Sequence, residues 1–230
     1  MSTPLRQLYD AMLHSLRSSD PRDTVRQDAM SKTLEMIGNI DLSGLNISRE
    51  EPMLEGIENL DIPLAQMRAD RRSEMGVLAD AIAAARQQLP WRVAHAYYYP
   101  EGANPGPGYL STNMSCEIIG PEGAPVYASD FRLGLFYFGA NVLYRDHAHL
   151  APELYVTLAG PSHWRQNCGE WMDVPAGSVM FNHSNQPHAM QSGAMPFFAI
   201  FVWLSDVHEK IALVPMPDWQ AIETDLARKP

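Results

Sequence analysis

The chain has 230 residues and a mass of 25.7 kDa, which is enough to bury the core of one large domain without disulfide bonds. Hydrophobic residues make up 46% and charged residues 19% of the chain, a composition typical of a folded protein and not of a disordered one. The formal net charge of −10 disfavours negatively charged partners, so neither nucleic acid nor an anionic membrane surface is expected.

Two features of the sequence indicate a soluble, cytoplasmic protein. The longest purely apolar run, Phe197 to Leu204, has eight residues, far fewer than the ~20 that a membrane-spanning helix needs. Arg and Asp are interleaved through the first thirty residues, so the apolar core of a secretion signal is missing there. In a reducing compartment we expect Cys116 and Cys168 to be unpaired, small and buried.

Apolar residues recur at helical spacing before residue 90. This pattern predicts a first helix that begins at Pro4, a second from about Pro21 to Ile37, and a third from about Ile62 to Gln88. The stretch 39–61 is rich in turn residues and is predicted to be an irregular connection. Met67 and Met75 on the third helix suggest a surface for a homodimer.

After Pro90 the apolar period falls to about two, and aromatic and β-branched residues become frequent. We predict strands near Trp91–Tyr99, Ser115–Ile119, Phe131–Phe138, Glu153–Leu158, His163–Asn167, Glu170–Val174, Ser178–Asn182 and Pro196–Trp203. Short strands with tight turns indicate an antiparallel barrel or jelly roll, and the stripe Trp219, Ile222, Leu226 predicts a closing helix.

The expected architecture is therefore mainly β, in three parts. Residues 1–90 form a helical region that packs on the barrel or forms an interface, residues 91–215 form the barrel, and residues 216–230 form a short C-terminal helix.

The segment 144–155 holds the densest polar cluster of the chain. His147 and His149 are two residues apart, so on a strand they point to the same face, and a turn can bring Glu153 back to them. Three such side chains within seven residues predict a metal site. The remaining ligand is expected from a distant strand, with His188 as the candidate and His183 as its competitor.

These residues resemble the two motifs of the cupin superfamily. The first is His147-x-His149-xxx-Glu153-xxxxxx-Gly160, and the second is Gly169-xxxxx-Pro175-x-Gly177 followed by Pro187-His188. Gly139 lies two residues further from His147 than usual, and Ser192 stands where Asn is common; both are turn positions and leave the ligand assignment intact. The resemblance implies a jelly-roll-like β-barrel that holds a metal in its mouth.

Two tyrosines flank the ligands: Tyr144, three residues before His147, and Tyr155, two residues after Glu153. This arrangement is similar to that of the cupin-type dimethylsulfoniopropionate (DMSP) lyases of marine bacteria, in which a helical segment also precedes the barrel. The resemblance implies that this chain cleaves DMSP, a small zwitterion, to dimethyl sulfide and acrylate.

The implied reaction is a β-elimination, in which a base removes the proton α to the carboxylate and a neutral thioether leaves the β carbon. Three neutral imidazoles and one glutamate leave a divalent ion with a net charge of about +1, which suits a substrate carboxylate. Zinc, iron or manganese are the expected metals. We assign the base to Tyr155 and the orientation of the substrate to Tyr144.

Aromatic side chains are candidates to hold the sulfonium by cation–π contact. They are Trp164, Trp171, Trp203, Phe136, Tyr137 and Tyr97 to Tyr99.

Two other classes of function use the same fold. A metal-dependent oxygenase or isomerase would bind iron through the same ligands, and a non-catalytic cupin would only bind a small ligand. The tyrosine pair favours the lyase, because an oxygenase has no need of a phenolate base. A sensor usually brings a DNA-binding domain, and the N-terminal helices lack a basic face.

Overall fold

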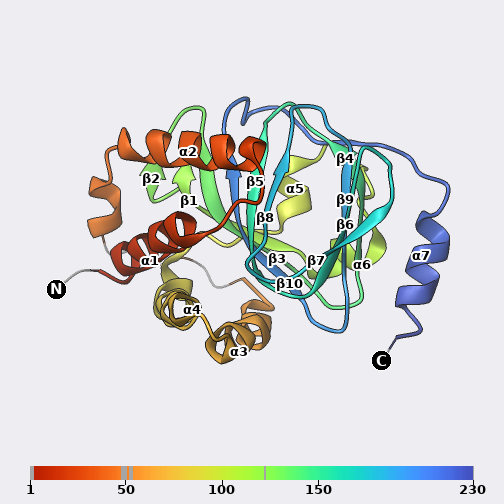
Figure 1. Ribbon diagram of the computed structural model, residues 1–230, viewed down its shortest axis with the longest axis horizontal. Helices are drawn as coiled ribbons and strands as arrows, with labels where there is room; N and C mark the ends of the chain where they lie inside the picture. The colour runs from red at the N-terminus through yellow and green to blue at the C-terminus, as the bar shows by residue number, and fades with distance from the viewer. Residues whose placement is uncertain (1–2, 48–50, 52–53, 122, 230) are drawn as a thin grey trace.

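The computed structural model describes residues 3–47, 51, 54–121 and 123–229. Two β-sheets face each other, N-terminal helices cover one of them, and a C-terminal helix lies on the opposite side of the molecule (Figure 1). Helix accounts for 37% of the structure and strand for 26%, so the expectation of a mainly β protein was wrong. The sheets form a two-layer sandwich and not the closed barrel that we expected, because no described strand of one sheet pairs with a strand of the other.

Local hydrogen bonds explain where the N-terminal helices begin and end. Helix α1 starts at Pro4 because the Thr3 side chain accepts a hydrogen bond from the backbone N–H of Arg6. Helix α2 starts three residues later than predicted because Asp23 is its N-cap. The predicted third helix is divided in two, since the Asp70 side chain accepts a hydrogen bond from the backbone of Arg72 and stabilises a turn there.

The α-helices are α1 (Pro4–Ser18), α2 (Thr24–Gly38), α3 (Asp61–Ala69), α4 (Ser73–Ala85), α5 (Ala94–Tyr98), α6 (Pro107–Thr112) and α7 (Trp219–Leu226). The predicted connection 39–61 contains the 3-10 helices η1 (Ser43–Asn46) and η2 (Ile57–Leu60), and its residues 48–50, 52 and 53 lie outside the described residues; η3 (Arg86–Gln88) follows α4. Among the described residues, no helix is both long enough and apolar enough to cross a membrane.

The strands are β1 (Met114–Gly120), β2 (Val126–Tyr127), β3 (Arg132–Phe138), β4 (Leu143–Ala148), β5 (Glu153–Ala159), β6 (Ser162–Gln166), β7 (Trp171–Val174), β8 (Val179–Asn182), β9 (His188–Ser192), β10 (Phe197–Trp203) and β11 (Ala212–Leu213). The strand predicted at residues 91–99 was wrong, because this segment contains helix α5 (Ala94–Tyr98), preceded by a single β-bridge between Arg92 and Ser115. The Asn113 side chain accepts a hydrogen bond from the backbone N–H of His95, so a distant residue stabilises the first turn of this helix.

The six-stranded sheet, in the order β2-β1-β3-β10-β5-β8, is buried on both of its faces. Every residue of β1, β3, β5 and β10 is buried. Helices α1 to α4 pack on the outer face and form a continuous apolar core with it. Met67 and Met75 belong to this core and are at most 2% exposed, so they do not form the dimer surface that we expected.

The five-stranded sheet, in the order β11-β4-β9-β6-β7, packs on the inner face of the six-stranded sheet. The space between the two sheets is filled mainly by aromatic side chains. They include Tyr144, Tyr155, Trp164, Phe197 and Trp203. The residues expected to carry chemistry lie in this second core.

Both cysteines are free thiols, as expected, but only one is buried. Cys116 is 0% exposed on β1, and burial raises the pKa of its thiol far above the ordinary value. Cys168 lies in the β6–β7 turn with a positive φ of 56° and is partly exposed, so its expected burial was wrong.

Gly134 is required by the close approach of β1 and β3. A Cβ at this position would overlap the backbone oxygen of Cys116 and the ring of Phe201. We expect Gly134→Ala to lower the free energy of unfolding by about 1–3 kcal/mol, because the overpacked strands must separate. Gly38→Ala is the control, since nothing lies within 4 Å of a Cβ there. Urea denaturation of the two variants measures the difference, and equal midpoints would contradict this account.

The two thiols should differ in reactivity. We expect a thiol-reactive aromatic disulfide to label one cysteine in the native protein, Cys168, and both after denaturation, because the thiolate of Cys116 is neither accessible nor stabilised. Absorbance of the released thiolate counts the sites, and peptide mass spectrometry identifies them. Labelling of Cys116 in the native state would show that β1 is more open than described.

Candidate metal centre

Three buried histidines come together from two neighbouring strands of the five-stranded sheet. His147 lies on β4 directly opposite His188 on β9, and His149 follows the end of β4. One ring nitrogen of each lies within 4.8 Å of those of the other two. The alternative ligand His183 is exposed and packs beside Phe181, outside this group.

A backbone carbonyl fixes the orientation of each of these imidazoles. The Nδ1–H of His147 donates to the oxygen of Arg145 at 2.7 Å, that of His149 to Ala151 at 2.8 Å, and that of His188 to Gln186 at 2.9 Å. A carbonyl oxygen only accepts hydrogen bonds, so the proton of each neutral ring lies on Nδ1. In the neutral form of each ring, Nε2 therefore presents a lone pair.

Glu153, the first residue of β5, completes the group. Its Oε2 lies 3.2 Å from Nε2 of His149 and 3.4 Å from Nε2 of His188. The Trp203 indole N–H donates to Oε1 at 2.7 Å, and the Asn182 amide donates to Oε2 at 3.4 Å. Burial alone would raise the pKa of this carboxyl, but its interactions with His149 and His188 outweigh burial and hold the pKa below its usual range.

The donor set fits a divalent transition metal. Burial lowers the pKa of His147 well below its ordinary value, and the adjacent His188 and His149 lower it further, so the ring is neutral. Nε2 of His188 is buried and has no hydrogen-bond partner among the described residues, with Glu153 Oε2 3.4 Å away. Three imidazole nitrogens beside one carboxylate, with the other nitrogen of each ring bonded to a carbonyl, are typical of catalytic metal sites.

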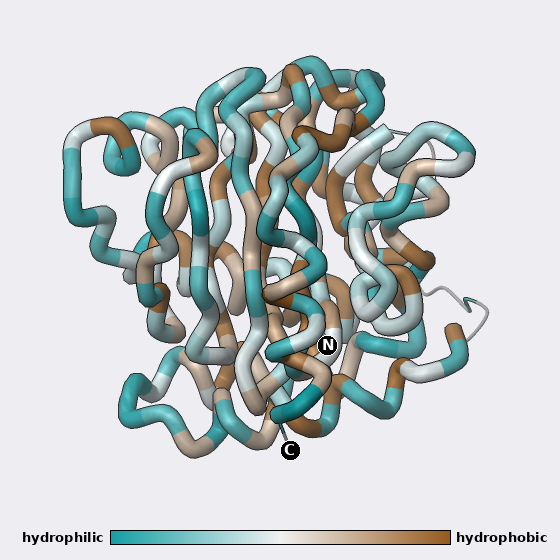
Figure 2. Tube along the Cα trace, turned by 90° about the vertical axis from the view of Figure 1, so that its right-hand side faces the viewer, coloured by the Kyte–Doolittle hydropathy of each residue, from teal (hydrophilic) through white to brown (hydrophobic). Residues whose placement is uncertain are grey.

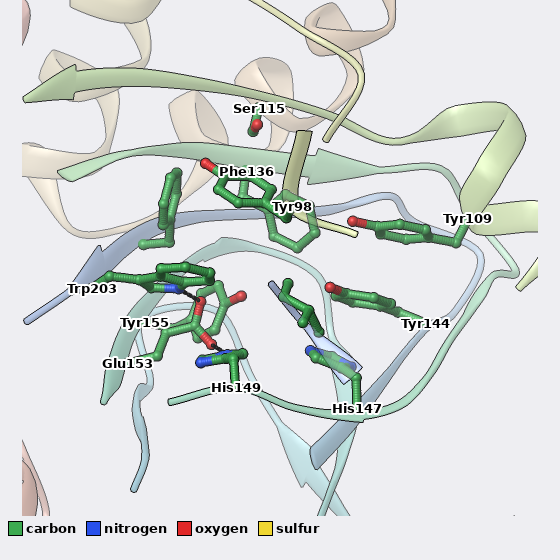
Figure 3. A pocket seen from close by; sticks show the side chains of 12 residues that line it. Tyr98, Tyr109, Ser115, Phe136, Tyr144, His147, His149, Glu153, Tyr155 and Trp203 are labelled. Carbon is green, nitrogen blue, oxygen red and sulfur yellow. Dashed lines mark hydrogen bonds and ion pairs between the residues drawn. The ribbon is translucent and has the colours of Figure 1, made fainter. Parts of the chain in front are cut away.

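Aromatic rings hold the ligands in place (Figure 3). Tyr144 stacks on His147 with ring centroids 4.1 Å apart, and Trp203 stacks on His149 at 4.6 Å. The Tyr99 hydroxyl donates to that of Tyr144 at 2.9 Å, so helix α5 also supports the group. Tyr155 lies on the same face of β5 as Glu153 and is 3% exposed.

A small pocket lies between the sheets beside the candidate ligands. It is lined by Tyr98, Tyr109, Ser115, Phe136, Tyr144, His147, His149, Glu153, Tyr155, Phe201, Trp203 and Ile211. Both predicted catalytic tyrosines and three of the four predicted metal ligands therefore line one cavity.

Some of the aromatic residues singled out from the sequence do not line this pocket. Tyr137 belongs to the core on the other face of the six-stranded sheet, and Trp164 packs behind Tyr155. Trp171 and Tyr97 lie against arginine side chains elsewhere. Sequence reasoning also missed Tyr109 and Phe201, because nothing in their local pattern distinguishes a pocket ring from a core ring.

Comparison with known proteins supports the family predicted from the sequence. Residues 48–199 match the family model of dimethylsulfoniopropionate lyases. The DMSP lyase DddQ of Ruegeria pomeroyi is 26% identical over 148 residues, which cover 63% of this chain and 71% of that protein.

Two crystal structures share the fold. One, described as DMSP lyases RdDddP and RnDddQII, aligns with a TM-score of 0.69 and 19% identity over 92% of this chain and 98% of its own. The structure of the Ruegeria pomeroyi enzyme aligns with a TM-score of 0.57 and 22% identity over 84% of this chain and 97% of its own. The family model covers well over half of the residues, so this chain belongs to the dimethylsulfoniopropionate lyase family of carbon–sulfur lyases.

Proposed function

We propose that this protein cleaves DMSP to dimethyl sulfide and acrylate by a β-elimination within the pocket between its two sheets. Membership of the family supports this substrate. The observation that carries the proposal is the convergence of three imidazoles, each with its proton fixed on Nδ1, beside two tyrosines in an aromatic cavity.

The proposed ligands of one divalent ion, zinc, iron or manganese, are His147, His149, His188 and Glu153. When bound, such an ion supplies positive charge that binds the substrate carboxylate and shares the negative charge developing beside it. Trp203 and the three backbone carbonyls keep these side chains aimed at one point before substrate arrives.

Tyr155 is the proposed base. Burial raises the pKa of its phenol well above the ordinary value, and the charge of Glu153 raises it further. The phenolate therefore forms only with a positive charge close by, which restricts the base to the assembled site. The phenolate oxygen takes the α proton, the electron pair of that C–H bond forms the double bond of acrylate, and the C–S bond breaks to release neutral dimethyl sulfide.

Tyr144 is proposed to orient the substrate. Its ring lies between His147 and Tyr109, which stack on it with centroids 4.1 and 4.0 Å away. Its hydroxyl accepts a hydrogen bond from Tyr99 and can donate its own proton to a carboxylate in the pocket.

The sulfonium group is proposed to bind at the aromatic wall formed by Tyr98, Phe136, Phe201 and Trp203. Cation–π contact in such a desolvated site contributes about 2 kcal/mol. The Tyr98 hydroxyl donates to the buried carboxylate of Glu117 at 2.8 Å, which fixes the position of its ring.

The metal-ligand proposal is tested by two matched histidine variants. We expect His188→Ala to lose bound metal and turnover, because it removes one of three convergent nitrogens. His183→Ala should keep both, since this exposed side chain lies five residues before His188 and outside the group. Plasma mass spectrometry of dialysed protein gives the metal content. Full metal content in the first variant, or its loss in the second, would refute the ligand set.

The base is tested with two buried tyrosines on opposite faces of the six-stranded sheet. We expect Tyr155→Phe to lower turnover of DMSP by at least about 100-fold while metal content is unchanged, because only the proton acceptor is lost. Tyr137→Phe is the control, since Tyr137 faces the opposite core. Gas chromatography of dimethyl sulfide and liquid chromatography of acrylate measure the rate. Parent-like activity of Tyr155→Phe would exclude this residue as the base, and a parent that forms neither product would refute the proposed reaction.

A further inference from the structure

Strand β4 contains a bulge between Tyr144 and His147. Tyr144 lies opposite Met190 on β9, and His147 lies opposite His188. An advance of three residues along β4 therefore corresponds to only two residues along β9, which leaves one extra residue in β4. In a regular strand, residues three apart point to opposite faces. The extra residue places Tyr144 and His147 on the same face, where their rings stack in the pocket.

The two residues of the bulge, Arg145 and Asp146, make their contacts on the other side of the sheet. The Arg145 guanidinium donates to both carboxylate oxygens of Glu223 on α7, at 2.8 and 2.9 Å, and lies 4.9 Å from the ring centre of Trp219. The backbone oxygen of Arg145 is also the acceptor that orients His147. One residue thus connects α7 to the His147 ring.

Asp146 is 0% exposed and is bound by donors from two elements. The Trp219 indole N–H donates to its Oδ2 at 2.7 Å, and the Arg165 guanidinium on β6 donates to both carboxylate oxygens, to Oδ1 at 2.9 Å and to Oδ2 at 2.5 Å. Arg165 also donates to Asp218, the residue that precedes α7. Arg165 thus pairs both oxygens of the buried carboxylate, and α7 adds the Trp219 indole as a third donor and Asp218 as a second partner of Arg165.

Polar contacts help to hold α7 on the sheet. Leu226 is the one buried residue among the eight of this helix. Figure 2 shows the molecule from the side on which α7 lies, with this helix in front of the strands. The ion pair of Glu223 with Arg145 and the indole hydrogen bond of Trp219 to Asp146 therefore contribute to the attachment of this helix to the bulge.

We propose that α7 fixes the β4 bulge and that Trp219 and Glu223 are positioning residues for Tyr144 and His147. Neither residue touches the pocket; both act through Arg145 and Asp146. The effect on metal affinity rests on the proposed metal site, whereas the effect on the bulge does not.

The test uses Trp219→Phe, Glu223→Gln and the double variant in the full-length protein. Asp225→Asn is the matched control, because Asp225 lies on the same helix and pairs only with the equally exposed Arg228 among the described residues. Hydrogen exchange of the metal-free proteins reports on residues 143–149, with α4 as the internal reference. Chelator competition, well below the unfolding temperature, reports metal affinity.

We expect the double variant to exchange at least about tenfold faster in residues 143–149 while α4 is unchanged, and to bind metal about tenfold more weakly. The control should match the parent in both measurements. Unchanged exchange in residues 143–149 would overturn the proposal, and so would faster exchange with unchanged metal affinity, since α7 would then support the sheet without positioning the ligands. If the parent itself binds no metal, the metal site is refuted, and the exchange result alone decides whether α7 fixes the bulge.

Discussion

Hydrogen bonds from three imidazoles to backbone carbonyls determine what this pocket can bind. Each acceptor lies two residues along the chain from its histidine, so the local backbone that carries the ring also orients it. A side-chain acceptor could rotate or take up a proton, but a peptide carbonyl does neither near neutral pH. Three lone pairs are thereby directed into a space that water hardly reaches, and an electrophile is the chemical partner that satisfies them.

The second constraint is the connection between the candidate metal ligands and the aromatic wall. Trp203, at the end of β10, stacks on His149 and donates its indole N–H to Glu153. The same ring lines the pocket. The Trp203 side chain therefore couples the shape of the cavity to the positions of His149 and Glu153. A substitution in the wall at this residue also moves these two side chains.

The sequence predicts the parts of this site that are local. His147, His149 and Glu153 lie within seven residues, and the second motif identifies His188 over His183 without knowledge of the register. Helices α1 and α7 were also predictable, because their apolar stripes and the Pro4 start are local signals.

The rest depends on pairing between distant segments. The bulge in β4 is defined by its register with β9, and periodicity alone does not show that Tyr144 and His147 share a face. Helix α5 was predicted as a strand because its first turn is stabilised by Asn113, a residue far along the chain. The break of the predicted third helix at Asp70 has a local cause, the hydrogen bond from the Arg72 backbone N–H to the Asp70 side chain. It was not predicted because the apolar residues keep their helical spacing across the break.

The two-sided burial of the six-stranded sheet also limits how this protein can be divided. Its outer face, with Ile118, Leu133 and Val202, is covered by helices α1 to α4, which all precede residue 90. A fragment that began at residue 91 would expose this apolar surface to water and self-associate. The helical layer is therefore integral to the cooperative unit that folds, although all the residues of the pocket come from later in the chain.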